Sequence, residues 1–166
     1  MKDIIIFKKN IKTFSFVFTF IAFIYPIKAL FAYMENDLSY LGLITDDSLP
    51  IFLWMTFLVK FISNIIFFIG IFFLVKTLNF DDIKDIFSSE KVLLFKKTGH
   101  YFLSSASVGS LVIIIQIFDG KFAGLKGSND FLFTLYFSLI IGFFFYVFSK
   151  ILEKANELKQ ENDLTI

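Results

Sequence analysis

The chain has no cysteine and no arginine, and its only histidine is His100. Without cysteine it cannot form a disulfide, a thiol nucleophile or a thiolate metal site. A single histidine leaves little for a metal cluster, and no Ser/His or His/Glu metal pairing falls on one predicted helix face. We therefore expect no metal and no other cofactor, and we expect that the protein is not an enzyme.

An excess of charge of one sign is also missing. The 166 residues carry 16 lysines against 15 acidic residues, and a net charge of +1 gives no general attraction to nucleic acid. Apolar residues are abundant instead, because 57% of the chain is hydrophobic, 27 residues are Phe and the mean hydropathy is +0.75. A soluble fold of this length needs more polar residues to cover its surface. The composition predicts an integral membrane protein.

Four apolar runs are long enough to span a hydrocarbon core of roughly 30 Å at about 1.5 Å per residue. They cover residues 13–33, 51–75, 101–118 and 131–149. The first run is not typical of a cleaved signal, since Pro26 and Lys28 stand where the small residues of a cleavage site are expected. We predict an all-α fold in which residues 1–166 form a single transmembrane domain, a four-helix transmembrane bundle.

The distribution of lysines predicts the orientation of this bundle. Twelve lysines lie in the N-terminal segment, in the loop between the second and third spans, and in the C-terminal tail, whereas two lie in the loop 119–130 and none in the loop 36–50. Positive charge near the ends of spans is retained on the cytoplasmic side. We therefore expect a multi-pass protein of the cytoplasmic (inner) membrane whose N- and C-termini are both cytoplasmic.

The loop between the second and third spans has a helical period of its own. Phe80, Ile83, Phe87 and Leu94 recur opposite Asp81, Asp82, Lys84 and Asp85. This spacing favours an amphipathic helix on the inner membrane surface, and chance periodicity in a solvated loop is the alternative. Ser88 or Ser89 is suited to cap a further helix, with Glu90 in its first turn, that continues into the third span.

The tail continues the fourth span as a cytoplasmic amphipathic helix, with Ile151, Ala155 and Leu158 on one side. A solvated helix end and a docking surface, for a partner or for the middle loop, both fit this pattern. The candidate cytoplasmic partner surface consists of the apolar residues Phe80, Ile83, Phe87, Leu158 and Leu164.

Each span carries a stripe of mostly small or polar residues at helical spacing. These are Ser15, Thr19, Ala22, Pro26 and Ala29 in the first span; Thr56, Lys60, Ser63 and Gly70 in the second; Ser105, Gly109, Val112 and Gln116 in the third; and Thr134, Ser138 and Gly142 in the fourth. In lipid, small residues mark the faces where helices approach closely. We expect the stripes to form the interior of the bundle rather than a polar pore, because Ser and Thr in spans usually bond to their own backbone.

Lys60 is the only charged residue in the run 51–75. Counting along the helix places it roughly 7 Å below the outer edge of the membrane, at the level of Lys28. The candidate outer-facing polar cluster consists of Lys28, Lys60, Asn64 and Gln116. Either each lysine snorkels to the outer headgroups, or the two line a shallow outward-facing cavity that holds an acidic loop residue or an anionic ligand.

Two stretches resemble a known family. They are the loop residues Phe87, Ser88, Glu90 and Gly99 and the tail residues Glu157, Leu158, Glu161, Asp163, Leu164, Thr165 and Ile166. The chain resembles the bacterial membrane family DUF2975, although Asp85 and Ile86 stand where a proline is common in that family. The resemblance implies four spans, no assigned activity or catalytic residue, and a gene that often lies beside a small helix-turn-helix regulator.

These patterns favour a non-enzymatic membrane sensor or an accessory, regulatory protein. A small transporter or channel component is one alternative, and a membrane protein of the bacteriocin-immunity type is another. Besides the lipid bilayer, the expected partner is a cytoplasmic helix-turn-helix regulator or another membrane protein. We expect no direct binding to nucleic acid.

Overall fold

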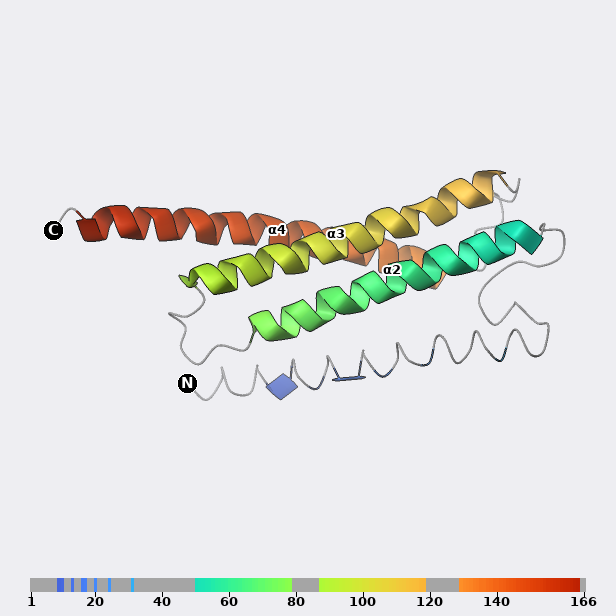
Figure 1. The fold of residues 1–166 in the computed structure, drawn as a ribbon, viewed down its shortest axis with the longest axis horizontal. Helices are drawn as coiled ribbons and strands as arrows, with labels where there is room; N and C mark the ends of the chain where they lie inside the picture. Colours follow the sequence, from blue (N-terminus) through green and yellow to red (C-terminus); the bar gives the residue numbers. More distant parts are fainter. Residues whose placement is uncertain are drawn as a thin grey trace.

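The protein is all-helical over the residues that its computed structural model describes, which are 50–78, 87–118, 129–164 and isolated positions between 9 and 31. In this part of the chain the long helices are α2 (Pro50–Thr77), α3 (Ser89–Phe118) and α4 (Asn129–Leu164). Both α2 and α4 pack on α3, so α3 is the central helix of the three (Figure 1). All three are long and apolar enough to cross a membrane, as expected of a membrane protein.

The predicted first span, 13–33, lies outside the described residues except at a few positions. Those positions, Thr13, Phe16, Val17, Phe20, Ile24 and Phe31, are helical and exposed. The hydroxyl of Thr13 donates a hydrogen bond of 3.0 Å to the carbonyl of Lys9. The stripe of small residues expected in this span also lies outside the described residues, and a fourth helix of the bundle stays a prediction.

The sequence correctly predicts how α3 begins. The backbone N–H of Lys91 donates to the hydroxyl of Ser88 at 3.3 Å, and the N–H of Val92 donates to the Ser88 carbonyl at 3.0 Å. Ser88 is therefore the N-cap, and Glu90 lies in the first turn, where a carboxylate is favoured by the helix dipole. From there α3 continues without a break to Phe118, which confirms that the capped helix runs into the third span.

Most of the surface helix predicted before α3 lies outside the described residues. Phe80 and Ile83 lie in the segment 79–86, outside the described part of the chain, and Phe87 lies immediately before the N-cap. Leu94, which the sequence pattern groups with the surface helix, instead belongs to α3 and is buried. The surface helix stays a prediction for the residues that precede Phe87.

Helix α4 is longer than a membrane requires. Its 36 residues correspond to about 54 Å, whereas the hydrocarbon core is about 30 Å thick. Leu152 packs against Val92 and Phe95 near the start of α3. The rest of α4 projects past the start of α3, as the upper left of Figure 1 shows. The tail therefore continues the fourth span as one helix, as the sequence predicts.

The interior of the described bundle holds the polar stripes as well as aromatic side chains. Thr56, Lys60, Ser63, Ser105 and Ser138 are buried, whereas large apolar side chains such as Ile62 and Ile140 are exposed. This arrangement is expected for helices in a membrane, where large apolar side chains face the lipid and small residues face neighbouring helices. The stripes predicted for the second, third and fourth spans are thus confirmed as contact faces. Gln116 near the end of α3 and Thr134 near the start of α4 are only partly buried.

Candidate polar interior and lysine-rich end

A pair of serines joins α2 to α3 by reciprocal hydrogen bonds. The hydroxyl of Ser63 donates to the Ser105 carbonyl at 2.9 Å, and the hydroxyl of Ser105 donates to the Ser63 carbonyl at 2.9 Å. Both residues are buried, and their hydroxyl oxygens lie 3.3 Å apart. Such bonds require a close backbone approach, which small side chains permit. They fix the antiparallel register of the two helices at this level.

Lys60 lies on the same face of α2, one turn from Ser63. Its residue is only 3% exposed, so the side chain lies inside the bundle and not on the lipid-facing surface. The snorkelling interpretation requires a stem that faces lipid, and it does not fit this position. Six residues toward the start of α2, Trp54 is half exposed, and tryptophan in membrane proteins is typical of the interface. Counted along the helix, Lys60 lies roughly 9 Å from Trp54, and its depth in the membrane stays a prediction.

The structure separates the other members of the predicted polar cluster. Asn64 lies one turn from Lys60 on α2 and is half-buried, as is Gln116 near the far end of α3. The Ser63–Ser105 register places Lys60 opposite about residue 108, so Gln116 lies on the order of 12 Å further toward the C-terminal end of α3. Lys28 lies outside the described residues. Within the described part of the cluster, Asn64 is therefore the neighbour of Lys60 along the helix axis.

Helices α3 and α4 meet at two glycines. A methyl group at Gly99 would stand 2.7 Å from the backbone nitrogen of Tyr146 and 2.9 Å from the Gly142 carbonyl oxygen. A methyl group at Gly142 would stand 2.9 Å from the backbone nitrogen of Leu103. These distances are shorter than van der Waals contact, so only glycine permits this approach of the two backbones. The sequence identified Gly142 as a contact residue but not Gly99.

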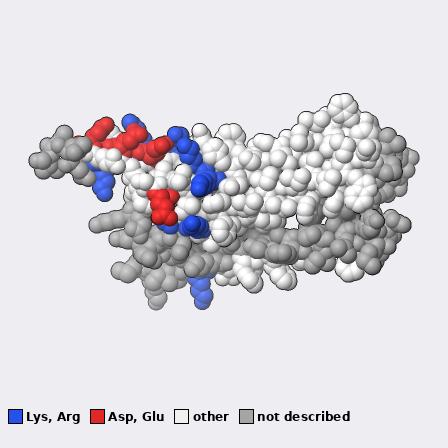
Figure 2. Space-filling model, in the orientation of Figure 1, with Lys and Arg blue, Asp and Glu red and all other residues white. Residues whose placement is uncertain are grey.

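The end of the bundle where α2 ends and α3 begins carries several lysines, and we call it the lysine-rich end. The hydroxyls of Thr77 and Thr98 are buried there, 3.5 Å apart, and each also donates to a backbone carbonyl of its own helix. The Lys91 Nζ donates to the Lys76 carbonyl at 3.2 Å, which satisfies a carbonyl at the end of α2. Charged atoms in Figure 2 gather at this end and along the tail, and the remaining described surface on that face carries none.

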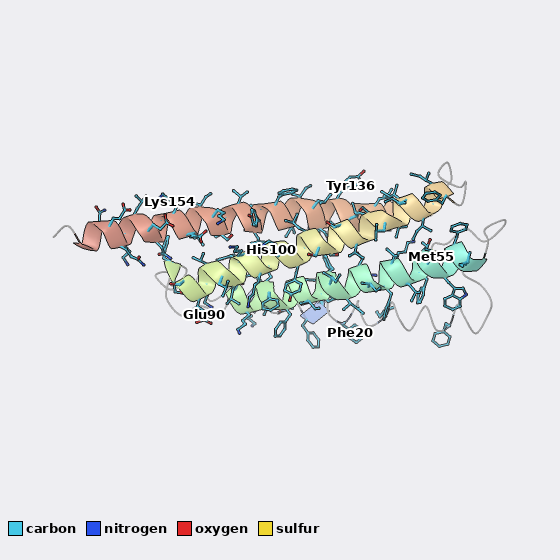
Figure 3. All side chains as sticks on the ribbon, turned by 45° about the horizontal axis from the view of Figure 1, so that its top comes forward. Phe20, Met55, Glu90, His100, Tyr136 and Lys154 are labelled. Atoms are coloured by element: carbon cyan, nitrogen blue, oxygen red, sulfur yellow. The ribbon has the colours of Figure 1, made fainter. Side chains whose placement is uncertain are left out.

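The tail of α4 is a charged, exposed helix. Ion pairs of 2.7 Å between Lys150 and Glu153 and of 2.9 Å between Lys154 and Glu157 connect successive turns. Water screens ion pairs of this exposure, so they support the helix only weakly. Figure 3 shows the labelled Lys154 on this tail, at the same end of the molecule as Glu90 on α3.

Two residues of the predicted partner surface are described at this end. Phe87 is exposed immediately before α3, and Leu158 is 52% exposed on the tail. Because Val92 packs near Leu152, the antiparallel register places Phe87 and Leu158 at about the same level. Phe80 and Ile83 lie outside the described residues. Leu164 is the last residue of α4.

A metal site requires several ligand side chains close together. Among the described residues, no group of three or more His, Cys, Asp or Glu side chains that could hold a metal ion occurs. His100, labelled in Figure 3, is exposed on α3. Its ring makes an edge-to-face contact with Tyr146, with 5.4 Å between ring centroids. The polar and charged groups that this part of the chain presents are the buried Lys60, the lysine-rich end and the exposed tail.

Comparison with known proteins supports the family resemblance. No curated protein matches the chain, and no solved structure matches it. The family model described as "Protein of unknown function (DUF2975)" matches residues 18–166, which include all of α2, α3 and α4. Since this match covers most of the chain, the protein belongs to the DUF2975 family.

Proposed function

We propose that the protein is a non-enzymatic sensor or accessory protein of the cytoplasmic membrane, with four spans and both termini in the cytoplasm. The observation that carries this proposal is the continuity of α4, which runs from the apolar span into an exposed tail beyond the start of α3. A helix without a break conveys a shift or rotation from one end to the other, and shifts of this kind are a common switching mode.

The polar interior is the proposed input. The Ser63–Ser105 pair lies between α2 and α3, and Lys60 is buried one turn away on α2, so a change in their hydrogen bonding displaces one helix against the other. Because α3 is packed against both α2 and α4, such a displacement reaches the tail through the Gly99–Gly142 contact. A ligand shifts the balance between two arrangements of the helices only if it binds one of them more tightly. In this proposal the buried ammonium group of Lys60 provides that difference in binding.

The proposed output is the apolar surface at the lysine-rich end, which includes Phe87, Leu158 and the surface helix predicted before Phe87. Exposed apolar side chains on a charged helix are suited to dock a protein partner. The partner in this proposal is a cytoplasmic helix-turn-helix regulator or a second membrane protein.

Affinity purification of the full chain from its native membranes tests the output. We expect such a partner to co-purify with the unmodified protein. Leu158→Glu is expected to abolish the interaction because it places a charge in an apolar contact, whereas Gln160→Glu adds the same charge at another exposed tail position and is expected to retain it. Equal recovery of the partner with both variants, or recovery of no partner with the unmodified chain, contradicts the proposal.

A transporter or channel component is the second candidate, and the buried position of Lys60 favours it. Ionisable residues inside membrane bundles often mark ion or substrate pathways. A measurement of ion or solute flux across liposomes that contain the protein separates the two proposals, because a sensor carries no flux. A flux that Lys60→Met abolishes would assign the protein to the transporters.

A further inference from the structure

Two ammonium groups are held at the lysine-rich end by contacts between α2 and α3. The Lys91 Nζ donates to the Lys76 carbonyl at 3.2 Å, which fixes the Lys91 side chain at the end of α2. The Lys97 Nζ lies 5.7 Å from the centroid of the Phe73 ring, within the range of a cation–π contact. Lys76 itself is exposed in the last turn of α2. Side chains from both helices therefore bring positive charge to one place.

An aromatic pair lies directly beside these lysines. The Phe73 ring of α2 and the Tyr101 ring of α3 are stacked, with 5.0 Å between centroids and an angle of 9° between planes. Both residues are half-buried. Tyrosine is enriched where the hydrocarbon core meets the headgroups, and lysine beside it places its ammonium group in the headgroup layer. This combination of an apolar platform and ammonium groups matches the chemistry of a phospholipid, which has acyl chains below a phosphate.

The described charges at this site favour an anion. Lys76 and Lys97 contribute two positive charges, and Glu90 in the first turn of α3 contributes a negative one; Lys91 is already bonded to the Lys76 carbonyl and is not counted. The acidic residues of the segment 79–86 lie outside the described residues, which is why the test below uses the full chain.

We propose that the lysine-rich end of α2 and α3 binds the headgroup of an anionic phospholipid. In this site Lys76 and Lys97 contact the phosphate, and the Phe73–Tyr101 pair contacts the upper part of the acyl chains. The proposal is independent of whether the protein signals or transports, because it concerns the annular lipid and not the polar interior.

Titration of the purified full chain with phosphatidylglycerol, followed by native mass spectrometry, tests this site, with phosphatidylcholine as the neutral comparison. Each lysine near a membrane surface contributes enough attraction for anionic lipid that Lys76→Gln/Lys97→Gln is expected to weaken binding roughly thirtyfold. The matched control is Lys154→Gln/Lys159→Gln, which removes two exposed lysines from the tail and is expected to leave the affinity unchanged. Lys76→Arg/Lys97→Arg keeps the charge and is expected to keep the binding.

The outcomes are distinct. Selective loss in the glutamine variant at the lysine-rich end supports the site. An equal loss in both glutamine variants shows a general effect of net charge and overturns it. Equal affinity of the unmodified protein for phosphatidylglycerol and phosphatidylcholine also overturns it.

Discussion

Substitution of single glycines by alanine measures how closely the helices are packed. At Gly99 the added methyl group would stand 2.7 Å from the Tyr146 backbone nitrogen, so the α3 and α4 backbones must separate by about 1 Å to reach ordinary contact. Backbone atoms cannot rotate away, and overpacking costs up to about 3 kcal/mol. Alanine gains at most about 1 kcal/mol of helix propensity over glycine. Gly99→Ala is therefore expected to lower the free energy of unfolding by about 2 kcal/mol.

Gly70→Ala is the matched control. Its methyl group would lie 3.4 Å from the Phe102 ring and from Tyr101 Cβ, which is ordinary van der Waals contact. We expect this variant to be as stable as the unmodified protein or more stable by up to about 1 kcal/mol. Unfolding of both variants in detergent by added dodecyl sulfate, followed through the fluorescence of the only tryptophan, Trp54, gives the comparison. If Gly99→Ala is at least as stable as Gly70→Ala, the close approach of α3 and α4 is wrong.

Two further predictions concern the helix contacts and the topology. The reciprocal bonds between Ser63 and Ser105 predict that Ser63→Ala and Ser105→Ala are coupled by about 1 kcal/mol in a double-mutant cycle of unfolding, and additive effects would contradict this. Since the chain has no cysteine, single cysteines report orientation, and we expect an impermeant maleimide added outside whole cells to label Ser128→Cys but not Ser89→Cys. Labelling of Ser89→Cys under these conditions would invert the proposed topology.

The interior faces of the described helices are predictable from the sequence because they depend on one helix at a time. In a run of large apolar residues, Thr56, Ser63 and Gly70 stand at helical spacing. Small and polar residues are favoured on the face that contacts another helix and not on the face that contacts lipid. The N-cap at Ser88 is predictable for the same reason, since capping involves residues three or four positions apart.

Contacts between helices were not predictable, because they depend on the axial register and the rotation of two helices at once. The pairing of Ser63 with Ser105 follows from this register, as does the separation of Gln116 from Lys60. Gly99 was not included in the predicted stripes because it precedes the apolar run 101–118. Its spacing of seven residues from the small residue Ala106, which lies on the same helix face and is buried, was the available signal.

The same limit applies to Lys60. Its depth follows from a count of residues along one helix, whereas its direction, toward the interior or toward lipid, depends on what surrounds that helix. Its position between Thr56 and Ser63 on the polar stripe was the signal for the interior. The sequence alone leaves snorkelling and a cavity both open, because both place the ammonium group near the membrane surface.

The coupling of the polar interior to the tail is the central claim, and a distance across the proposed output tests it directly. Spin labels at Phe87→Cys and Leu158→Cys report the separation of α3 and the tail in nanodiscs by pulsed electron paramagnetic resonance. We expect Lys60→Met to shift this distance by on the order of 1–2 Å, the size of helix shifts in known switches. The control Ile62→Met alters an exposed position on the same helix and is expected to leave the distance unchanged. Identical distance distributions for the two variants would contradict the claim that the interior communicates with the tail.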